Sequence, residues 1–577
     1  MTQQKRNNIF CIILLIMSFI NLVITHTFIG QYTEVALDTT SYTNNITGII
    51  FDISTLFCLF FVLFKGNLKK GAGFCFFTSL LWAFSNILYS RFFFQYISFS
   101  SISQISNVFD SLIFRCLIES IQWTDLSFFL ILLVGIVIYH KTNSTIIKFK
   151  FIFLSVSLLL LFSCILSISA TIIYSVSMPS TKSLGYIRHH LYSHHFDLYR
   201  NSANPNWTYF QRGFLRTMLQ PQIHALLSKN MLTPKQIELI NREIHDQNSK
   251  ITKCKVPNIE NIIFIIIESY LSMTSDMIVD GKEITPNLNA LKRDSTVYYN
   301  GKMKSNITIG ESGDGQFICM TGLLPLRSEI TIGKAKEIVL PGLPIILAKK
   351  MNLETKMLIP TTPSMWEQEK MCKQYGISKL YSSNDFNTGK GDLNDEQIFQ
   401  ALQSIDKHST KPFFSIVLTM SMHQPYDHNL DMTFKLSSTD YSKEFLHYLN
   451  ACHYTDHQIG KYLQHLKNYG IYDNSLIIIT SDHHPNPNSL QMKDLNHDIP
   501  LYILNSGLSN NLYSGDCQQI DIYTTILDIL IKDHLFWRGL GNTLLSSSRR
   551  TPLTQAKWDL SEWIIQNNYF KTRFQLE

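Results

Sequence analysis

The residues of this chain that could do chemistry begin with a serine set among glycines and acids, in the stretch Gly310-Glu311-Ser312-Gly313-Asp314-Gly315. An apolar run follows, which is typical of a turn that opens into a helix. Ser312 would then lie near the helix N-terminus, where backbone N–H groups favour negative charge, and it is a candidate nucleophile. Most clusters of glycine, serine and aspartate are ordinary turns. The hypothesis therefore depends on which other groups the fold brings to Ser312.

Acids and imidazoles follow several strongly apolar runs. Three such runs have this form: 262–267 before Glu268, 413–420 before His423, and 475–480 before Ser481, Asp482 and His483. Continuous, mostly β-branched runs are typical of strands buried on both faces of a parallel sheet. The carboxyl ends of parallel strands share one edge, and ligands bind there in open α/β sheets. Polar residues often end strands, but three ends with two carboxylates and several histidines indicate a metal site.

A divalent metal would give the serine its reactivity. Glu268, Asp482 and His483 offer two anionic oxygens and one nitrogen, and the Ser312 hydroxyl adds a third oxygen. This mixed set suits Mn²⁺ or Zn²⁺, and Mg²⁺ less well. Coordination lowers the pKa of a bound hydroxyl by several units, and the ion also neutralises phosphate charge. His423 could hydrogen-bond a phosphate oxygen or protonate a leaving group, or it could be an ordinary loop histidine beside Gln424-Pro425.

These groups need an α/β scaffold to position them. From residue 258 onward, short apolar strands alternate with amphipathic segments, and residues 500–504 are a further, shorter strand candidate. Helical periodicity runs through 442–467, and 520–532 is another helix candidate. Alternation of this kind predicts an α/β sandwich with a mostly parallel central sheet, here over residues 258–577.

The first third of the 577-residue chain has the sequence pattern of a membrane-spanning domain. Five apolar runs approach the ~20 residues of a bilayer crossing, namely 8–30, 46–64, 72–90, 125–140 and 150–177. Lys and Arg gather before the first run, between the second and third, and between the fourth and fifth. This predicts a cytoplasmic N-terminus, a five-helix transmembrane domain over 1–177, and everything after residue 178 outside. A signal peptide or a soluble protein with buried helices fits such a series poorly.

Two features of the membrane part have more than one interpretation. Asp52 falls inside the second run, where an acid is a functional hypothesis by default, although a solvated acid at the membrane interface explains it as well. The aromatic and basic stretch 186–195 contains four histidines, which favour the lipid interface over a metal site. Residues 178–257 are therefore predicted to be an interfacial helical connector.

Composition narrows the remaining possibilities. The net charge is +6 without a basic block, so nothing indicates a nucleic-acid partner. The ten cysteines form no CxxC or Cys/His zinc pattern. Five of them follow residue 250, namely Cys254, Cys319, Cys372, Cys452 and Cys517. This odd number argues against a complete disulfide framework there, and one or two bridges remain open.

Taken together, these motifs resemble the lipoteichoic acid synthase family of membrane phosphoglycerol transferases, within the alkaline phosphatase/sulfatase superfamily. The resemblance covers nearly the whole chain, including five spans, Ile266-Ile267-Glu268-Ser269, Thr285-Pro286-Asn287-Leu288, the Ser312 stretch, Ser481-Asp482-His483 and Gln519-Ile520-Asp521-Ile522. It implies metal ligands at Glu268, Ser312, Asp482 and His483, with Mn²⁺ as the expected ion, and a nucleophile at Ser312, where the family usually has threonine. It also implies substrate contacts at His423, Trp366 and Gln368.

Departures from the family pattern are informative. The family often has an arginine where this chain has Gln368, so a phosphate clamp is missing and the head group is open. Sulfatases need x-Pro-x-Arg after the modified residue, and Ser312 is followed by Gly313-Asp314-Gly315-Gln316 instead. Phosphoethanolamine transferases share the five-span layout, but their usual Gly-Glu-Thr signature is not seen around Glu268.

The resemblance implies an enzyme of the bacterial cytoplasmic membrane. It would move a phosphoglycerol group from a phospholipid, expected to be phosphatidylglycerol, through a Ser312 intermediate to an envelope polymer or glycan. Transfer of another head group such as phosphoethanolamine, or hydrolysis with water as acceptor, are the alternatives. A receptor or scaffold without activity is hard to reconcile with four filled metal positions.

Overall fold

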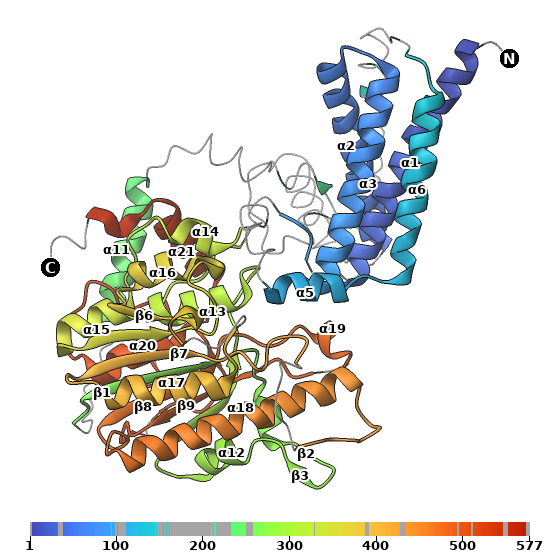
Figure 1. Ribbon diagram of the computed structural model, residues 1–577. Coiled ribbons are helices and arrows are strands. Elements are labelled where there is room, and N and C mark those ends of the chain that lie inside the picture. The colour runs from blue at the N-terminus through green and yellow to red at the C-terminus, as the bar shows by residue number, and fades with distance from the viewer. Residues whose placement is uncertain are drawn as a thin grey trace, which may run out of the picture. The chain divides into compact units, whose positions relative to one another are not determined.

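The chain forms two compact units, one made of residues 1–105 and 113–229 and the other of residues 106–112 and 230–577 (Figure 1). The computed structural model describes residues 3–32, 39–93, 95–98, 111–144, 232–249, 258–327, 329–386, 392–426, 434–492, 495–508, 512–545 and 552–572, with isolated residues between 101 and 218 besides. The predicted boundaries at 177 and 257 stay predictions.

An eight-stranded sheet is the centre of the second unit. Its order is β10 (Cys517–Gln518), β4 (Tyr298–Lys304), β9 (Ile499–Leu504), β8 (Ser475–Ser481), β1 (Asn261–Ile267), β7 (Phe413–Leu418), β5 (Glu354–Leu358) and β6 (Lys379–Tyr381). All neighbours pair in parallel except β8 with β9 and β9 with β4. The predicted mostly parallel sheet is therefore confirmed. A separate hairpin joins β2 (Ile278–Val279) to β3 (Lys282–Glu283).

Helices cover both faces of this sheet. They are α11 (Pro234–Ser249), α12 (Pro286–Arg293), α13 (Glu311–Thr321), α14 (Thr331–Ala335), α15 (Leu343–Met351), α16 (Gln368–Tyr375), α17 (Asp395–Lys407), α18 (Lys443–Asn468), α19 (Pro487–Leu490), α20 (Asp521–Leu530) and α21 (Gln555–Gln566). Short 3₁₀ turns are η4 (Ser272–Asp276), η5 (Met365–Glu367), η6 (Ser383–Asp385) and η8 (Tyr569–Thr572). Local sequence explains the starts of the longer helices. The Ser442 hydroxyl accepts from Phe445 N–H before α18, and the Asn394 side chain accepts from Gln397 N–H before α17.

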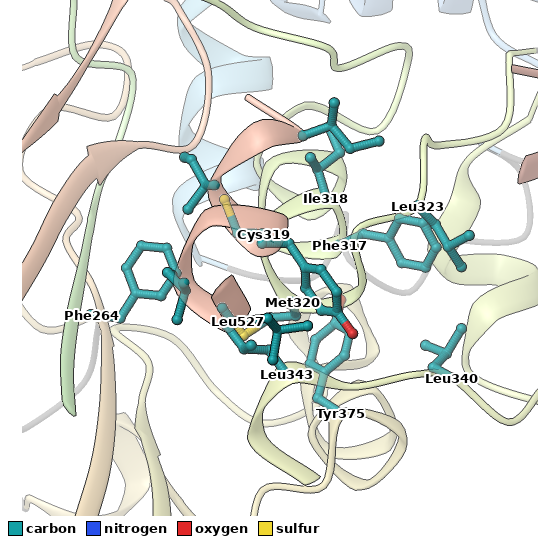
Figure 2. Close-up of a cluster of buried hydrophobic side chains, with 14 of the residues drawn as sticks. Phe264, Phe317, Ile318, Cys319, Met320, Leu323, Leu340, Leu343, Tyr375 and Leu527 are labelled. Carbon is teal, nitrogen blue, oxygen red and sulfur yellow. The ribbon is translucent and has the colours of Figure 1, made fainter. Parts of the chain in front are cut away.

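The helix that carries Ser312 is fixed by the largest hydrophobic core. Phe317, Ile318, Cys319 and Met320 of α13 are fully buried, and Figure 2 shows them beside Leu343, Tyr375 and Leu527. Phe264 of β1 belongs to the same core, so α13 and the strand that precedes Glu268 share one core. In the described part of this unit, Cys319, Cys372, Cys452 and Cys517 are all free thiols. The bridges that the sequence left open are not formed by these four.

The first 141 residues form α1 (Gln3–Tyr32), α2 (Thr39–Phe64), α3 (Leu68–Phe93), α5 (Ser111–Glu119), η2 (Trp123–Asp125) and α6 (Leu126–Lys141). Three stretches among the described residues are long and apolar enough to cross a membrane: Asn7–Phe28, Leu68–Phe93 and Trp123–Lys141. They match the first, third and fourth predicted spans. The second predicted span lies within α2, which is not among the three, and nearly all of the fifth lies outside the described residues. Five crossings and their orientation stay predictions.

Asp52 is buried inside the first unit, not solvated. Its side chain is 0% exposed, accepts a hydrogen bond of 2.8 Å from Phe214 N–H, and lies 3.6 Å from His26 Nε2. Gly213 has φ +80°, and a Cβ there would lie 2.6 Å from Asp52 Oδ1. The interpretation as a solvated interfacial acid is therefore wrong. Asp52 therefore binds the backbone of residues 213–214 in the predicted connector. Residue 213 is a glycine because any Cβ there would clash with the carboxylate. Residues 186–195 lie outside the described residues.

The last helix of the predicted connector belongs to the second unit. Ile240 of α11 is fully buried in the large core, and Asn241 accepts from Tyr569 OH at 2.7 Å. Asn248 also donates to the Leu535 carbonyl at 2.7 Å. Residues 234–249 are therefore packed as part of the α/β unit, because α11 has an apolar side that the core covers.

Candidate active site

Ser312 meets the predicted acid and histidine at the N-terminus of α13. Its Oγ lies 3.0 Å from Glu268 Oε2 and 3.1 Å from His483 Nε2. Gly310 caps the helix, so Ser312 lies in the first turn, where N–H groups without helical partners favour a developing negative charge. The structure thus gives the serine the neighbours that its sequence context alone did not supply.

Glu268, Asp482 and His483 come together because β1 and β8 are neighbouring parallel strands. Ile267 pairs with Ser481 in the sheet, so the residues that follow both strands leave the same edge. Glu268 is 8% exposed, Asp482 3% and His483 6%. One ligand atom from each residue lies within 4.8 Å of the others. The three side chains that the sequence predicted as metal ligands therefore form one buried cluster.

The cluster is held by groups that sequence reasoning did not assign. Ser269 Oγ donates to Glu268 Oε1 at 2.7 Å, and Ser269 N–H donates to Asp482 Oδ1 at 2.8 Å. Gln519 Nε2 donates to the Asp482 carbonyl. A Cβ at Gly315 would lie 2.2 Å from that same carbonyl oxygen, so α13 approaches Asp482 through a glycine. Ser269 and Gln519 both lie in stretches that carried the resemblance, which was the available signal.

Asp314 shapes the turn before Ser312. It is fully buried, and its Oδ2 accepts from the N–H groups of Thr308 and Gly310 at 3.0 Å each and from the Thr308 hydroxyl at 2.8 Å. Burial raises the pKa of Asp314, while these donors act in the opposite direction. Asp314 therefore differs in role from Glu268, because its carboxylate is hydrogen-bonded to the backbone and stabilises the turn.

The pKa shifts in the cluster are those expected for buried acids that have too few positive charges around them. Burial, and then the charge of Glu268, raise the pKa of Asp482 to about 8. The pKa of Glu268 is lowered, because hydrogen bonding and charge from His483 outweigh its burial. The pKa of His483 is raised well above its ordinary value, because Asp482 and Glu268 outweigh the effect of burial. Two buried acids thus compete for one imidazole. A divalent cation would satisfy both, and the donor set of two carboxylates, one imidazole and one hydroxyl fits Mn²⁺ or Zn²⁺.

His423 follows β7, the other neighbour of β1 in the sheet. It is half-buried, and its Nδ1 lies 2.7 Å from the Gln424 carbonyl oxygen, which fixes the ring. Its charge is among the causes that lower the pKa of Glu268. The structure therefore places His423 on the same sheet edge as the predicted metal ligands.

Trp366 and Gln368 follow β5, the next strand along the sheet. Trp366 is half-buried against the large core, and Gln368 is 5% exposed and donates from Nε2 to Gln316 Oε1 at 3.2 Å. Gln316 lies one helical turn beyond Ser312 on α13. The predicted substrate residues thus connect to the nucleophile helix, through a glutamine that the sequence did not single out.

Several of these loops have strained backbone. Ser269, Glu311, Trp366, Glu367 and Tyr426 all have positive φ, between 46° and 72°. Non-glycine residues in this region carry strain of roughly 1–3 kcal/mol each, and such residues gather at functional sites. Those named here follow β1, β5 and β7 or begin α13, so strained backbone is present at the same edge of the sheet as the predicted site residues.

Comparison with known proteins agrees with this geometry. Residues 260–531 match the Sulfatase family model. These residues form a sulfatase-family domain. That domain contains every predicted site residue, from Glu268 to His483, and the chain is an enzyme. The family resemblance inferred from the motifs is confirmed.

The chain is also similar to proteins named as synthases. It is 28% identical over 316 residues to lipoteichoic acid synthase 2 of Bacillus subtilis, which covers 50% of this chain and 48% of that protein, about half its length. It is 25% identical over 583 residues to the lipoteichoic acid synthase of Staphylococcus aureus strain USA300, covering 94% of this chain and 85% of that protein. The crystal structure of the lipoteichoic acid synthase LtaP from Listeria monocytogenes aligns with 18% identity over 57% of this chain and 97% of that chain, with a TM-score of 0.47.

Proposed function

We propose that this enzyme is a metal-dependent transferase that moves a phosphoglycerol group from phosphatidylglycerol to a cell-envelope polymer or glycan. The observation that carries the proposal is the position of Ser312 Oγ, 3.0 Å from Glu268 Oε2 and 3.1 Å from His483 Nε2. A serine hydroxyl packed against a buried acid and an imidazole is arranged for nucleophilic attack, not for a simple turn. The names of the lipoteichoic acid synthase relatives supply the choice of phosphoglycerol.

The proposed reaction has two displacements. Ser312 Oγ loses its proton and attacks the phosphorus of the donor phosphodiester, and the bond to the diacylglycerol oxygen breaks. Diacylglycerol leaves with a proton, for which His423 is the proposed donor, and a phosphoglycerol ester of Ser312 remains. An acceptor hydroxyl then attacks the same phosphorus, gives up its proton and releases Ser312. Glu268, Asp482, His483 and Ser312 would hold a divalent ion, which would lower the pKa of the serine hydroxyl and neutralise phosphate charge.

The proposed setting is the outer face of the bacterial cytoplasmic membrane. The three apolar stretches of the first unit support membrane anchoring. Five crossings with a cytoplasmic N-terminus would leave the sulfatase-family domain outside, where donor head groups lie at the bilayer surface. The proposed partners are the phospholipid donor, the envelope acceptor and membrane lipid.

Transfer of phosphoethanolamine is the second candidate, and Gln368 is the observation that favours it. The amide of Gln368 has no charge, whereas the arginine usual in the family would repel the ammonium group of ethanolamine. The Gln368 side chain is buried, at 5% exposure. Which head group the enzyme transfers is therefore a question for experiment.

The experiment incubates the purified full chain and Mn²⁺ with phosphatidylglycerol and phosphatidylethanolamine vesicles separately. The proposal expects diacylglycerol from phosphatidylglycerol vesicles and a phosphoglycerol adduct on the Ser312 peptide by mass spectrometry. Release from phosphatidylethanolamine alone would establish the second candidate. No release from either lipid would overturn both.

A further inference from the structure

In the substrate turn, residues 362–370, two consecutive residues have a left-handed backbone conformation. Trp366 has φ 50° and ψ 27°, and Glu367 has φ 55° and ψ 31°. This region disfavours residues with a Cβ, and a bulky tryptophan is an unusual occupant. Such a conformation persists only where the surrounding structure holds it. The contacts of Glu367 show what holds it here.

Glu367 is clamped between two lysines. Lys336 Nζ lies 2.6 Å from Glu367 Oε1, and Lys370 Nζ lies 2.9 Å from Oε2. The hydrogen bonds from Lys336 and then Lys370 hold the pKa of Glu367 below its ordinary value, so the carboxylate is charged. The Lys336 side chain is 18% exposed, against 57% for Lys370. Water and salt screen the contact of Lys336 less, so Lys336 is the stronger tether.

Lys336 connects the turn to the nucleophile helix. It directly follows α14, and Gln374 Nε2 of α16 donates to its carbonyl at 3.1 Å. Ile332 of α14 lies against α13 beside Ser312, since a Cβ at Gly313 would lie 2.4 Å from Ile332 Cδ1. A tether from Glu367 to Lys336 is therefore also a tether to α13.

A second link runs in parallel. Gln368 Nε2 donates to Gln316 Oε1 at 3.2 Å, and Gln316 lies on α13 one turn beyond Ser312. Glu367 and Gln368 thus tie the turn to α13 by two routes, one through α14 and one direct. Trp366 stands immediately before both tied residues, so its distance from Ser312 is fixed by these contacts.

We propose that Lys336 is a positioning residue for the substrate turn. Its ion pair with Glu367 holds Trp366 in strained backbone at a set distance from Ser312, and so sets the affinity for the donor head group. The proposal rests on the proposed function in taking Trp366 as a substrate contact. Without the tether, the turn relaxes toward ordinary backbone and Trp366 moves out of register with the nucleophile.

The test uses the full chain with Lys336→Met, which keeps the aliphatic stem and removes the charge. Lys373→Met is the matched control. Lys373 lies on α16, the helix that begins directly after Glu367, and pairs with Glu369 at 3.0 Å, but these two side chains are 70% and 62% exposed and neither residue has strained backbone. Lys336→Arg is the conservative rescue. Hydrogen exchange of residues 362–370 reads the turn directly, and steady-state kinetics with phosphatidylglycerol micelles read its effect.

We expect Lys336→Met to speed amide exchange in 362–370 and to raise KM by about fivefold or more with kcat within about twofold, the signature of lost binding contacts. Lys373→Met and Lys336→Arg should match the unaltered chain in both readouts. In a Trp366→Ala background Lys336→Met should raise KM no further, because a residue that acts through Trp366 has nothing left to position.

Unchanged exchange in Lys336→Met would overturn the tether. Faster exchange with unchanged KM, or an additive loss in the Trp366→Ala background, would overturn its role in substrate binding. If no lipid donor is consumed by the unaltered chain, the proposed function fails, while the exchange measurement still decides whether Lys336 holds the turn.

Discussion

The acids of the active site and Asp528 are all buried, but they are neutralised in different ways. Asp528 has its own cation, the Arg538 guanidinium, and their side chains are 4% and 1% exposed. Arg538 also donates to the Ile531 carbonyl at 3.0 Å, so that pair is satisfied within the fold. Glu268 and Asp482 instead share His483, at 3.4 and 3.7 Å from its Nε2.

This difference separates a structural charge from a functional one. A buried acid with a dedicated cation needs nothing further, and removing that cation leaves an isolated charge that destabilises the fold. Glu268 and Asp482 instead share one imidazole, so the two acids have one cationic partner between them. The first arrangement is satisfied within the fold, and the second could hold a divalent ion. Each change described below affects either the Asp528–Arg538 pair or the candidate active site.

The largest effect is expected from Ser312→Ala. Removing the nucleophile should lower turnover by at least about a thousandfold, as losses of nucleophiles do in other covalent enzymes. The melting temperature should stay close to that of the unaltered chain, because the side chain lies at a helix start and not in the core. Lipid turnover and thermal unfolding measure the two. Turnover above a tenth of the original would remove Ser312 from its proposed role.

On the structural side, Arg538→Met should lower the free energy of unfolding by roughly 3–5 kcal/mol, because it leaves Asp528 buried without its cation. Chemical denaturation of the detergent-solubilised chain measures this. Metal affinity should not change in the fraction that stays folded. Adding Asp528→Asn to Arg538→Met should recover part of the loss, since no buried charge then remains. A loss below 1 kcal/mol would show that the pair is dispensable.

A smaller, pH-dependent effect is expected from the metal. Without an ion, the folded chain keeps protons on Asp482, with its pKa raised to about 8, and on His483, also raised, that the unfolded chain releases earlier. The contribution of Asp482 is therefore lost as pH rises toward 8, and that of His483 is lost as pH rises through its own raised pKa. A divalent ion must displace these protons, so its affinity grows with pH.

Mn²⁺ at a hundredfold excess over Kd should add about 2.7 kcal/mol to the free energy of unfolding at pH 8, and the same concentration should add less at pH 6. Thermal unfolding with and without Mn²⁺ at the two pH values measures the difference. An equal gain at both pH values would mean that the ion does not compete for the protons of this cluster.

The sequence predicted the part of the fold in which apolar runs are continuous. The strands predicted over 262–267, 413–420, 475–480 and 500–504 are confirmed as β1, β7, β8 and β9, although β7 ends two residues early, at Leu418. β5 was missed because it carries Lys356, whose buried ammonium is satisfied by distant groups, Asp406 and Ser409, 50 and 53 residues away. β4 was missed because Asn300, Gly301 and two lysines interrupt its pattern. Local periodicity cannot reveal a strand whose polar residues are satisfied by distant groups.

The candidate site divides in the same way. Glu268, Asp482 and His483 could be placed from strand ends, since the geometry of a parallel sheet brings such ends together. Lys336 and Gln316 could not, because their partners Glu367 and Gln368 are 31 and 52 residues away and depend on loop conformation. Asp52 was found as an acid in an apolar run, but its burial depends on Phe214, 162 residues later. The roles of the site residues in catalysis stay predictions.

The most direct measurement is calorimetric titration of Mn²⁺ into the metal-free full chain at pH 8. The account predicts one ion bound per chain. It predicts that Asp482→Asn abolishes this binding, whereas Asp406→Asn, which alters a buried acid that already has Lys356 beside it, leaves it intact. Absence of binding to the unaltered chain, or equal binding to the Asp482→Asn chain, would contradict the claim that the shared histidine marks a metal site.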